Sequence, residues 1–240
     1  MRVAVIGDLI VDEYITCQPL GMSQEDPTIV VTPLDTTRFI GGAGIVAAHA
    51  AGLGATVDFI SISGNDISRS FAVECLEKYR VQPMVFVDES RPTTLKQRYR
   101  SQGKSLLRVS HLHEAAISSK LQDKIVSHFL EVASQTNLLV LSDFNYGCLP
   151  NSLVSKLLSI ASSNGIYVAA DSQSSSQVGD IARFKGANLI TPTEREARIS
   201  MRNREDGLVV LADALIQQSE VDNVLLKLGG EGRMRPVSTV

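Results

Sequence analysis

The chain has 240 residues, of which 44% are hydrophobic and 20% charged, and its formal net charge is −3 at pH 7. This composition allows one substantial core and excludes a disordered protein. The slightly acidic balance leaves no basic footprint for nucleic acid, and no apolar run approaches a membrane span, so we expect neither partner. Three widely spaced cysteines without metal-ligand spacing predict reduced thiols in a cytoplasmic protein.

The first predicted strand is the apolar run Arg2–Gly7 (RVAVIG), which is typical of a strand buried on both faces. Two β-prone patches follow, EYITCQ and PTIVVTPLD, and they mix polar with apolar residues and contain prolines, as edge or surface strands do. A third patch runs from about Val85 to Val109, where SQGK predicts a hairpin turn. These patches predict a small β lid over one end of the core, at about residues 12–34 and 84–109.

Helices and strands alternate through the rest of the chain. The predicted helices are AGIVAAHAAGLG, SRSFAVECLEKY, SSKLQDKIVSHFLEVAS, NSLVSKLLSIASSN, a stretch at residues 194–200 and EDGLVVLADALIQQS. The predicted strands are TVDFISIS, NLLVLSD, IYVAAD, ANLITP and NVLLKLG. This order is typical of a mostly parallel sheet with helices on both faces, and no linker divides it, so we expect one α/β domain over residues 1–240.

The segment GAGIVA, which begins at Gly42, matches the G-x-G-x-x-A dinucleotide fingerprint. In a dinucleotide fold this motif directly follows the first strand. Here Gly41 lies 34 residues after Gly7, behind the predicted lid. An acidic residue, Asp66, does follow Gly42 by 24 residues, so an NAD-dependent enzyme remains an alternative.

Polar side chains follow one predicted core strand after another. They are Asp8, Asp12, Asn65, Asp66, Asp143, Asn145, Asp171, Thr193, Glu194 and Glu196. Because ligands of parallel α/β sheets bind outside the carboxyl ends of the strands, the series predicts a ligand site there.

Four segments in this order resemble the ribokinase-like (PfkB) family of carbohydrate kinases over essentially the whole chain: GDLIVD, GGAGIVAAHAAGLGATVDFISISGND, LLVLSDFNYGCL and ANLITPTEREA. Two further segments, SQEDPTIVV and TTLKQRYRSQGKSLLRV, are similar to the heptose-7-phosphate kinases within it, the kinase half of bifunctional ADP-heptose synthases. The resemblance implies a three-layer α/β/α sandwich with a mostly parallel sheet and a small β lid. It also implies a sugar or sugar phosphate under the lid, ATP with Mg²⁺ along the sheet, and a homodimer through the lid.

The resemblance implies substrate-binding roles for Asp8, Asp12, Gly41, Gly42, Asn65, Lys96, Arg98, Arg108 and Asp143. The Asp12 carboxylate would accept hydrogen bonds from sugar hydroxyls, and the two glycines would admit the sugar close to the backbone. The three basic residues would hold a substrate phosphate. Nucleotide-binding roles are implied for Asp171, Thr193, Glu196, Lys227, Gly229 and Gly232, with Glu196 also organising Mg²⁺.

The sequence departs from the family pattern at Ile45 and Thr193, where asparagine is usual, and at Tyr146 and Gln173, where lysine is usual. The motif D-x-x-G-A-G-D, whose last Asp activates the sugar hydroxyl and whose glycines form an anion hole, does not occur. We therefore expect a C-terminally truncated kinase domain with no catalytic residue of its own and impaired turnover. The alternative is a non-catalytic module that binds a sugar phosphate or nucleotide.

Overall fold

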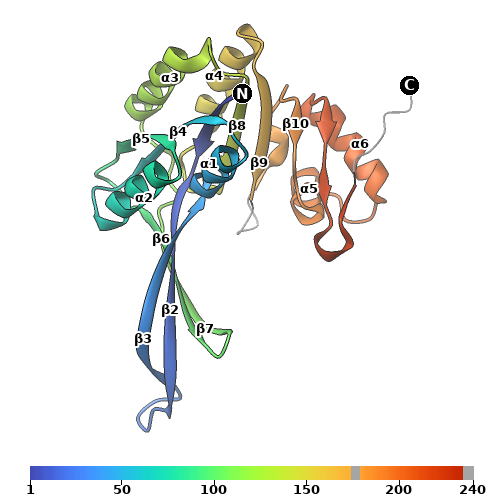
Figure 1. The fold of residues 1–240 in the computed structure, drawn as a ribbon. Coiled ribbons are helices and arrows are strands. Elements are labelled where there is room, and N and C mark those ends of the chain that lie inside the picture. Colours follow the sequence, from blue (N-terminus) through green and yellow to red (C-terminus); the bar gives the residue numbers. More distant parts are fainter. Residues whose placement is uncertain (174–178, 235–240) are drawn as a thin grey trace.

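A seven-stranded parallel sheet forms the centre of the computed structural model, which describes residues 1–173 and 179–234 (Figure 1). Its strand order is β11-β10-β9-β8-β1-β4-β5. The bounds are β1 Arg2–Gly7, β4 Thr56–Ser63, β5 Val81–Val87, β8 Leu138–Asp143, β9 Tyr167–Ser172, β10 Leu189–Ile190 and β11 Asn223–Val224. The last six residues of the tail RMRPVSTV lie outside the described part.

Helices cover both faces of this sheet, because each central strand is apolar on both sides. In β1, Val3 and Val5 pack into a cluster with α1 (Ala43–Gly52) and α2 (Ile67–Lys78). Ala4 and Ile6 point the other way, into a cluster with α3 (Ser119–Ala133), α4 (Asn151–Ser163), α5 (Glu194–Met201) and α6 (Leu208–Ser219). The expected α/β sandwich with a mostly parallel sheet is therefore confirmed.

A second, four-stranded sheet projects from one end of the core and forms the lid (Figure 1). Its order is β3-β2-β6-β7, with β2 Leu9–Met22, β3 Ile29–Gly42, β6 Thr94–Ser101 and β7 Lys104–His111. The strands β6 and β7 are joined through Gln102 and Gly103, whose φ angles of 49° and 79° suit a two-residue hairpin turn. The hairpin predicted at SQGK is confirmed.

Two boundaries of the predicted lid need correction. Residues 84–87, expected in the lid, pair in parallel with β4 and belong to the central sheet as the end of β5. The lid strand β3 continues to Gly42, beyond the expected limit at residue 34, and its exposed positions in the segment TTRF accommodate polar residues. The lid strands β2 and β3 therefore run without a linker into the core at Gly7 and Ala43.

The C-terminal strands are shorter than the sequence suggested. ANLITP contributes only β10, and NVLLKLG divides into β11 and β12 (Leu226–Lys227), which pairs with β13 (Arg233–Met234). Two 3₁₀ turns, η1 Ile181–Arg183 and η2 Gly229–Glu231, complete the elements. Across residues 1–173 and 179–234, the helices are too short or too polar to span a bilayer. All three cysteines are free thiols.

Candidate functional site

The strands β1 and β8 lie side by side at the point where the order in which the chain adds strands to the sheet reverses. From β1 the chain adds β4 and β5 on one side and then returns to add β8 on the other. Open α/β sheets bind ligands in the crevice at such a switch point. The residue after β1 is Asp8, and β8 ends with Asp143, so both acidic residues predicted from the sequence lie at this point.

Asp8 is buried and organises the loop after β8. Its carboxylate accepts hydrogen bonds from the backbone N–H groups of Phe144 (2.7 Å), Cys148 (3.1 Å) and Tyr146 (3.4 Å). Burial raises the pKa of Asp8 to about 6, and the nearby charge of Asp143 adds to the rise. Asp8 therefore lies beneath the loop that follows β8, and its contact with substrate stays a prediction.

Asp143 is also internal, with only 2% of its surface exposed. It forms an ion pair with the Arg183 guanidinium at 2.6 Å and accepts hydrogen bonds from the Ser172 hydroxyl (2.8 Å) and the Asn145 N–H (3.0 Å). These contacts tie β8, β9 and η1 together. Asp143 therefore occupies an internal position at the end of β8, and its contact with substrate stays a prediction.

Asp12 and the two glycines do lie together at the base of the lid. A Cβ atom on Gly41 would collide with the Asp12 carboxylate, and one on Gly42 would collide with the carbonyl oxygen of Asp8. Gly42 also has φ 58° and ψ −140°, a conformation that residues other than glycine rarely adopt, and it is the N-cap residue of α1. Glycine is therefore required at position 42, whereas a side chain at position 41 would displace the Asp12 carboxylate.

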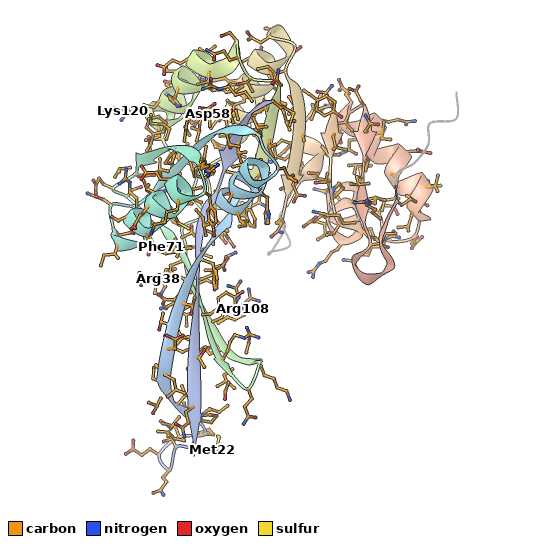
Figure 2. The ribbon with its side chains drawn as sticks, in the orientation of Figure 1. Met22, Arg38, Asp58, Phe71, Arg108 and Lys120 are labelled. Carbon is orange, nitrogen blue, oxygen red and sulfur yellow. The ribbon has the colours of Figure 1, made fainter. Side chains whose placement is uncertain are left out.

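The predicted basic residues share one face of the lid with Asp12. In the strand register Asp12 lies opposite Lys96, and Arg98 lies opposite Arg108. Side chains at positions two apart, or directly opposite across strands, point to the same face. Arg98 forms an ion pair with Asp12 and lies over the Tyr14 ring at 5.1 Å. Arg108 is exposed, between the far tip at Met22 and the core (Figure 2).

Asn65 follows the carboxyl end of β4, as expected, and its contact with substrate stays a prediction. It is exposed, and its side-chain amide donates to Glu89 at 3.3 Å. Its neighbour Asp66 caps α2 and accepts a hydrogen bond from the Thr93 N–H at 2.8 Å, which fixes the start of β6. The structure thus joins this strand end to the lid through Asp66.

The predicted nucleotide residues form a second group, at the ends of β9 and β10. Lys227 donates to Asp171 at 2.9 Å, and Thr193 forms an isolated β-bridge with Lys227. Thr193 and Glu196 form a capping box at the start of α5, with the Thr193 N–H 2.7 Å from the Glu196 carboxylate. Burial raises the pKa of Asp171, and Lys227 opposes that rise.

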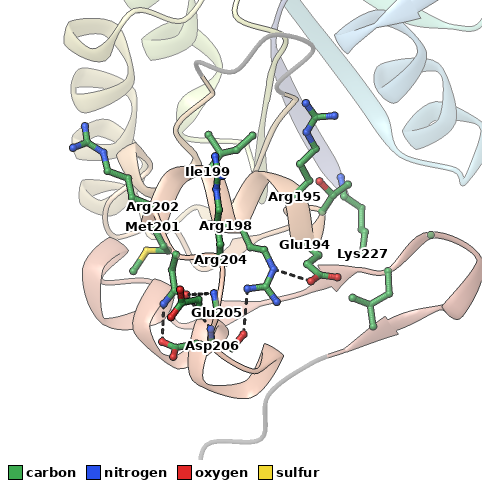
Figure 3. A pocket seen from close by; sticks show the side chains of 14 residues that line it. Glu194, Arg195, Arg198, Ile199, Met201, Arg202, Arg204, Glu205, Asp206 and Lys227 are labelled. Carbon is green, nitrogen blue, oxygen red and sulfur yellow. Dashed lines mark hydrogen bonds and ion pairs between the residues drawn. The ribbon is translucent and has the colours of Figure 1, made fainter.

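A pocket of about 1220 Å³ opens beside this group (Figure 3). Thr193, Lys227 and Gly229 line it, and Gly229 and Gly232 have φ angles of 61° and 101° in the turn between β12 and β13. Four arginines that sequence reasoning had not selected also line it: Arg195, Arg198, Arg202 and Arg204. Their clustering within the segment EREARISMRNR is the sequence feature that could have indicated this pocket.

Two further arginines, Arg91 and Arg183, were missed entirely. Arg91 is buried and donates to the carbonyl oxygens of Tyr146 (3.1 Å) and Ala115 (2.9 Å) while pairing with Asp88 (2.7 Å). Its partners are mostly backbone atoms from distant loops, and no local sequence pattern reports such contacts.

Comparisons with known proteins agree with this geometry. The family described as pfkB family carbohydrate kinase matches residues 1–234. The chain is 30% identical over 235 residues to the bifunctional protein HldE of Helicobacter hepaticus, covering 96% of this chain and 48% of that protein. It is 29% identical over 245 residues to HldE of Rhodopseudomonas palustris, covering 95% and 49%. The chain therefore spans about half the length of the curated relatives it matches.

Solved structures share the fold at lower identity. Phosphofructokinase-2 from Escherichia coli in complex with fructose-6-phosphate superposes with a TM-score of 0.76 at 16% identity, covering all of this chain and 77% of that one. Ribokinase from Arabidopsis thaliana, complexed with ribose and ATP, gives a TM-score of 0.71 at 17% identity, covering 100% and 75%.

Proposed function

The chain belongs to the pfkB family of carbohydrate kinases, and from this membership we propose that it binds heptose 7-phosphate under the lid. The proposed reaction is in-line transfer of the γ-phosphoryl group of ATP to a hydroxyl of that sugar phosphate. The relatives named HldE suggest this substrate, and the charges on the lid support it.

The observation that carries the proposal is the pairing of one carboxylate with several cations on a single lid face. Asp12 lies against Gly41 at the base of the lid, where its oxygens suit hydroxyl donors. Lys96, Arg98 and Arg108 extend from there along the same face. A ligand with hydroxyls at one end and a phosphate at the other matches this order of charges, since arginine and lysine bind phosphate strongly.

We propose that ATP lies along Asp171, Thr193, Glu196, Lys227 and the glycine turn, beside the arginine-lined pocket. The donor set fits Mg²⁺, because Asp171 and Glu196 offer hard oxygens and lie close enough for the charge of Glu196 to raise the pKa of Asp171. The described residues contain no cluster of three or more His, Cys, Asp or Glu side chains. Mg²⁺ usually takes one or two carboxylates and completes its shell with phosphate and water, and it would neutralise charge on the nucleotide.

A general base is not assigned within this sequence. Asp8 and Asp143 are both buried and engaged by backbone N–H groups or Arg183. This engagement favours the second candidate, a module that binds the sugar phosphate and ATP without turnover. The NAD alternative loses its support, because the glycine fingerprint follows a lid strand.

We also propose a homodimer formed through the lid, in a cytoplasmic protein. Large apolar side chains are exposed along the lid strands, including Met22 (60%), Leu34 (63%), Phe39 (51%) and Leu107 (57%). These side chains occur on both faces of the lid, since Phe39 lies opposite Asp12 and Leu107 opposite Tyr99, and a partner subunit would cover part of them. Analytical ultracentrifugation should report a dimer at micromolar concentration, and a monomer there would contradict this arrangement.

The direct test combines binding and turnover. The purified chain is titrated with heptose 7-phosphate and with ATP-Mg²⁺, and ADP release and product mass are then followed. Saturable binding of both ligands with release of ADP supports the kinase. Binding without ADP release supports the binding module, and failure to bind the sugar phosphate overturns both.

A further inference from the structure

We propose that Phe144 and Tyr146 form an aromatic seat that holds the Lys96 ammonium group for the substrate phosphate. The two rings then act as positioning residues, and they set the preference of the site for a phosphorylated sugar over an unphosphorylated one. The inference rests on the proposed function, because it assigns a role within the same sugar site.

The geometry of the seat brings one cation against two rings. The Lys96 Nζ atom lies 4.9 Å from the centroid of the Tyr146 ring and 5.5 Å from that of Phe144. The two rings are stacked, with centroids 6.5 Å apart and planes inclined by 26°. Both distances fall within the range of about 6 Å in which a ring face attracts a cation.

The loop that carries the two rings, after β8, is fixed by hydrogen bonds from its backbone to buried charged side chains. Phe144 and Tyr146 donate their backbone N–H groups to the buried Asp8, and the Tyr146 carbonyl accepts a hydrogen bond from buried Arg91. Gly147 follows with φ 85°, where a Cβ atom would collide with the Ala115 carbonyl. These contacts fix the two rings at the switch point of the sheet before any ligand arrives.

Lys96 itself comes from the lid strand β6, where it lies opposite Asp12 but forms no ion pair with it. Arg98, two residues further along the same face, forms an ion pair with Asp12. Among the described residues no ion pair joins Lys96 to an acidic side chain, and its ammonium group contacts the two rings instead. A phosphate that enters between the lid and the loop therefore meets a positive charge that is oriented but not neutralised.

Loss of the rings should release the lysine and lower phosphate affinity. A free lysine side chain regains rotamer freedom, which must be given up again when phosphate binds. From the usual strength of such contacts, we expect removal of the Tyr146 ring to weaken binding of the phosphorylated sugar by about three- to thirtyfold. The unphosphorylated sugar makes no use of the ammonium group in this arrangement, so its affinity should stay unchanged.

The experiment measures Kd by calorimetry for heptose 7-phosphate and for the unphosphorylated heptose. The variants are Tyr146→Leu, Phe144→Leu, Tyr146→Phe, Lys96→Met and the double variant Lys96→Met/Tyr146→Leu. Tyr146→Phe keeps the ring, so it should retain most of the preference for the phosphorylated sugar that Tyr146→Leu loses. The double variant should bind no more weakly than Lys96→Met alone, because the ring acts through the lysine. Lys104→Met, an exposed lysine at the start of β7, is the matched control and should change nothing.

A second readout reports the seat without any ligand. After reductive ¹³C-methylation of lysines, the Lys96 methyl resonance should carry a ring-current shift that disappears in Tyr146→Leu and Phe144→Leu. Thermal melts show whether each variant is folded, and Phe144→Leu serves where the more buried Tyr146 ring proves essential for folding.

The outcomes separate this inference from the function on which it rests. If wild type binds neither sugar, the proposed function fails and the seat fails with it. If wild type prefers the phosphorylated sugar but Tyr146→Leu and Phe144→Leu keep that preference, only the seat is overturned. Equal loss for both sugars, or a double variant weaker than Lys96→Met, also overturns it.

Discussion

Replacing Arg98 with alanine should weaken sugar-phosphate binding more than replacing Arg100 with alanine further along the same lid strand. A charge-assisted contact of arginine with phosphate is worth about 1.5–3 kcal/mol, or about 10- to 150-fold in Kd. The Arg98 side chain is 21% exposed and is shared with Asp12. Solvent and the carboxylate both weaken its hold on phosphate, so we expect a loss near the lower limit, about tenfold.

Arg100→Ala is the matched control for this measurement. Arg100 also lies over the Tyr14 ring, at 5.6 Å, but it donates to the Gly103 carbonyl at the exposed hairpin and not to Asp12. Calorimetry with heptose 7-phosphate should show the loss for Arg98→Ala only. Affinity for the unphosphorylated heptose should change by no more than about fivefold, since a partly exposed ion pair contributes only about 0–1 kcal/mol. Equal losses for the two sugars, or for the two arginines, would refute the reasoning.

Three further predictions concern stability and the nucleotide. Gly42→Ala should lower the free energy of unfolding by about 2–3 kcal/mol in urea titrations, because φ is positive and the Cβ atom meets the Asp8 carbonyl; a change below 0.5 kcal/mol would argue against the strained approach, since about that much is expected of ordinary surface changes. Burial raises the pKa of Asp8 from 3.8 to about 6, so in that window the folded protein binds the extra proton and loses stability as pH rises. The free energy of unfolding of wild type, minus that of Asp8→Asn, should therefore fall by up to about 3 kcal/mol from pH 4 to pH 7. A difference that does not depend on pH would contradict this. Lys227→Met removes the cation beside Asp171, so the pKa of that carboxyl should rise further and ATP affinity should fall about tenfold; unchanged ATP binding in calorimetry would remove Lys227 from the nucleotide site.

The order of strands and helices was predictable because each core strand is a short apolar run between amphipathic helices. TVDFISIS, for example, coincides with β4. The rule that ligands bind at carboxyl strand ends selected Asp8 and Asp143, which the structure places at the switch point of the sheet; their contact with a ligand stays a prediction. It could not tell exposed strand-end carboxylates from buried ones, since burial of Asp8 and Asp143 depends on a loop folding over them from another part of the chain.

Pairings between the lid and the core were beyond sequence reasoning for the same reason. Lys96 and Tyr146 are 50 residues apart, and only the strand register together with the loop conformation brings them into contact. The ends of the lid were also misjudged. The boundary between β5 and the lid lies in a run of β-prone residues whose sheet is decided by their partners, with Val85 pairing to Ser61 of the central sheet.

The way the lid is attached to the core would turn a small movement at its base into a large movement at its tip. The paired strands β2 and β3 are each 14 residues long, which corresponds to an arm of about 45 Å at about 3.3 Å per residue. Its attachment to the core is short, because Asp8 alone separates β1 from β2 and Gly42 leads directly into α1. The Ala43 N–H also donates to the Asp8 carbonyl at 2.9 Å, which stiffens this attachment. Asp12 and Gly41 lie beside this attachment, at the core end of the β2–β3 ribbon. A tilt of only about 5° there would sweep the tip through about 4 Å, given an arm of that length. A ligand that tilts the lid at its base would therefore displace the far end of the ribbon, and fluorophores attached at the tip could measure that displacement.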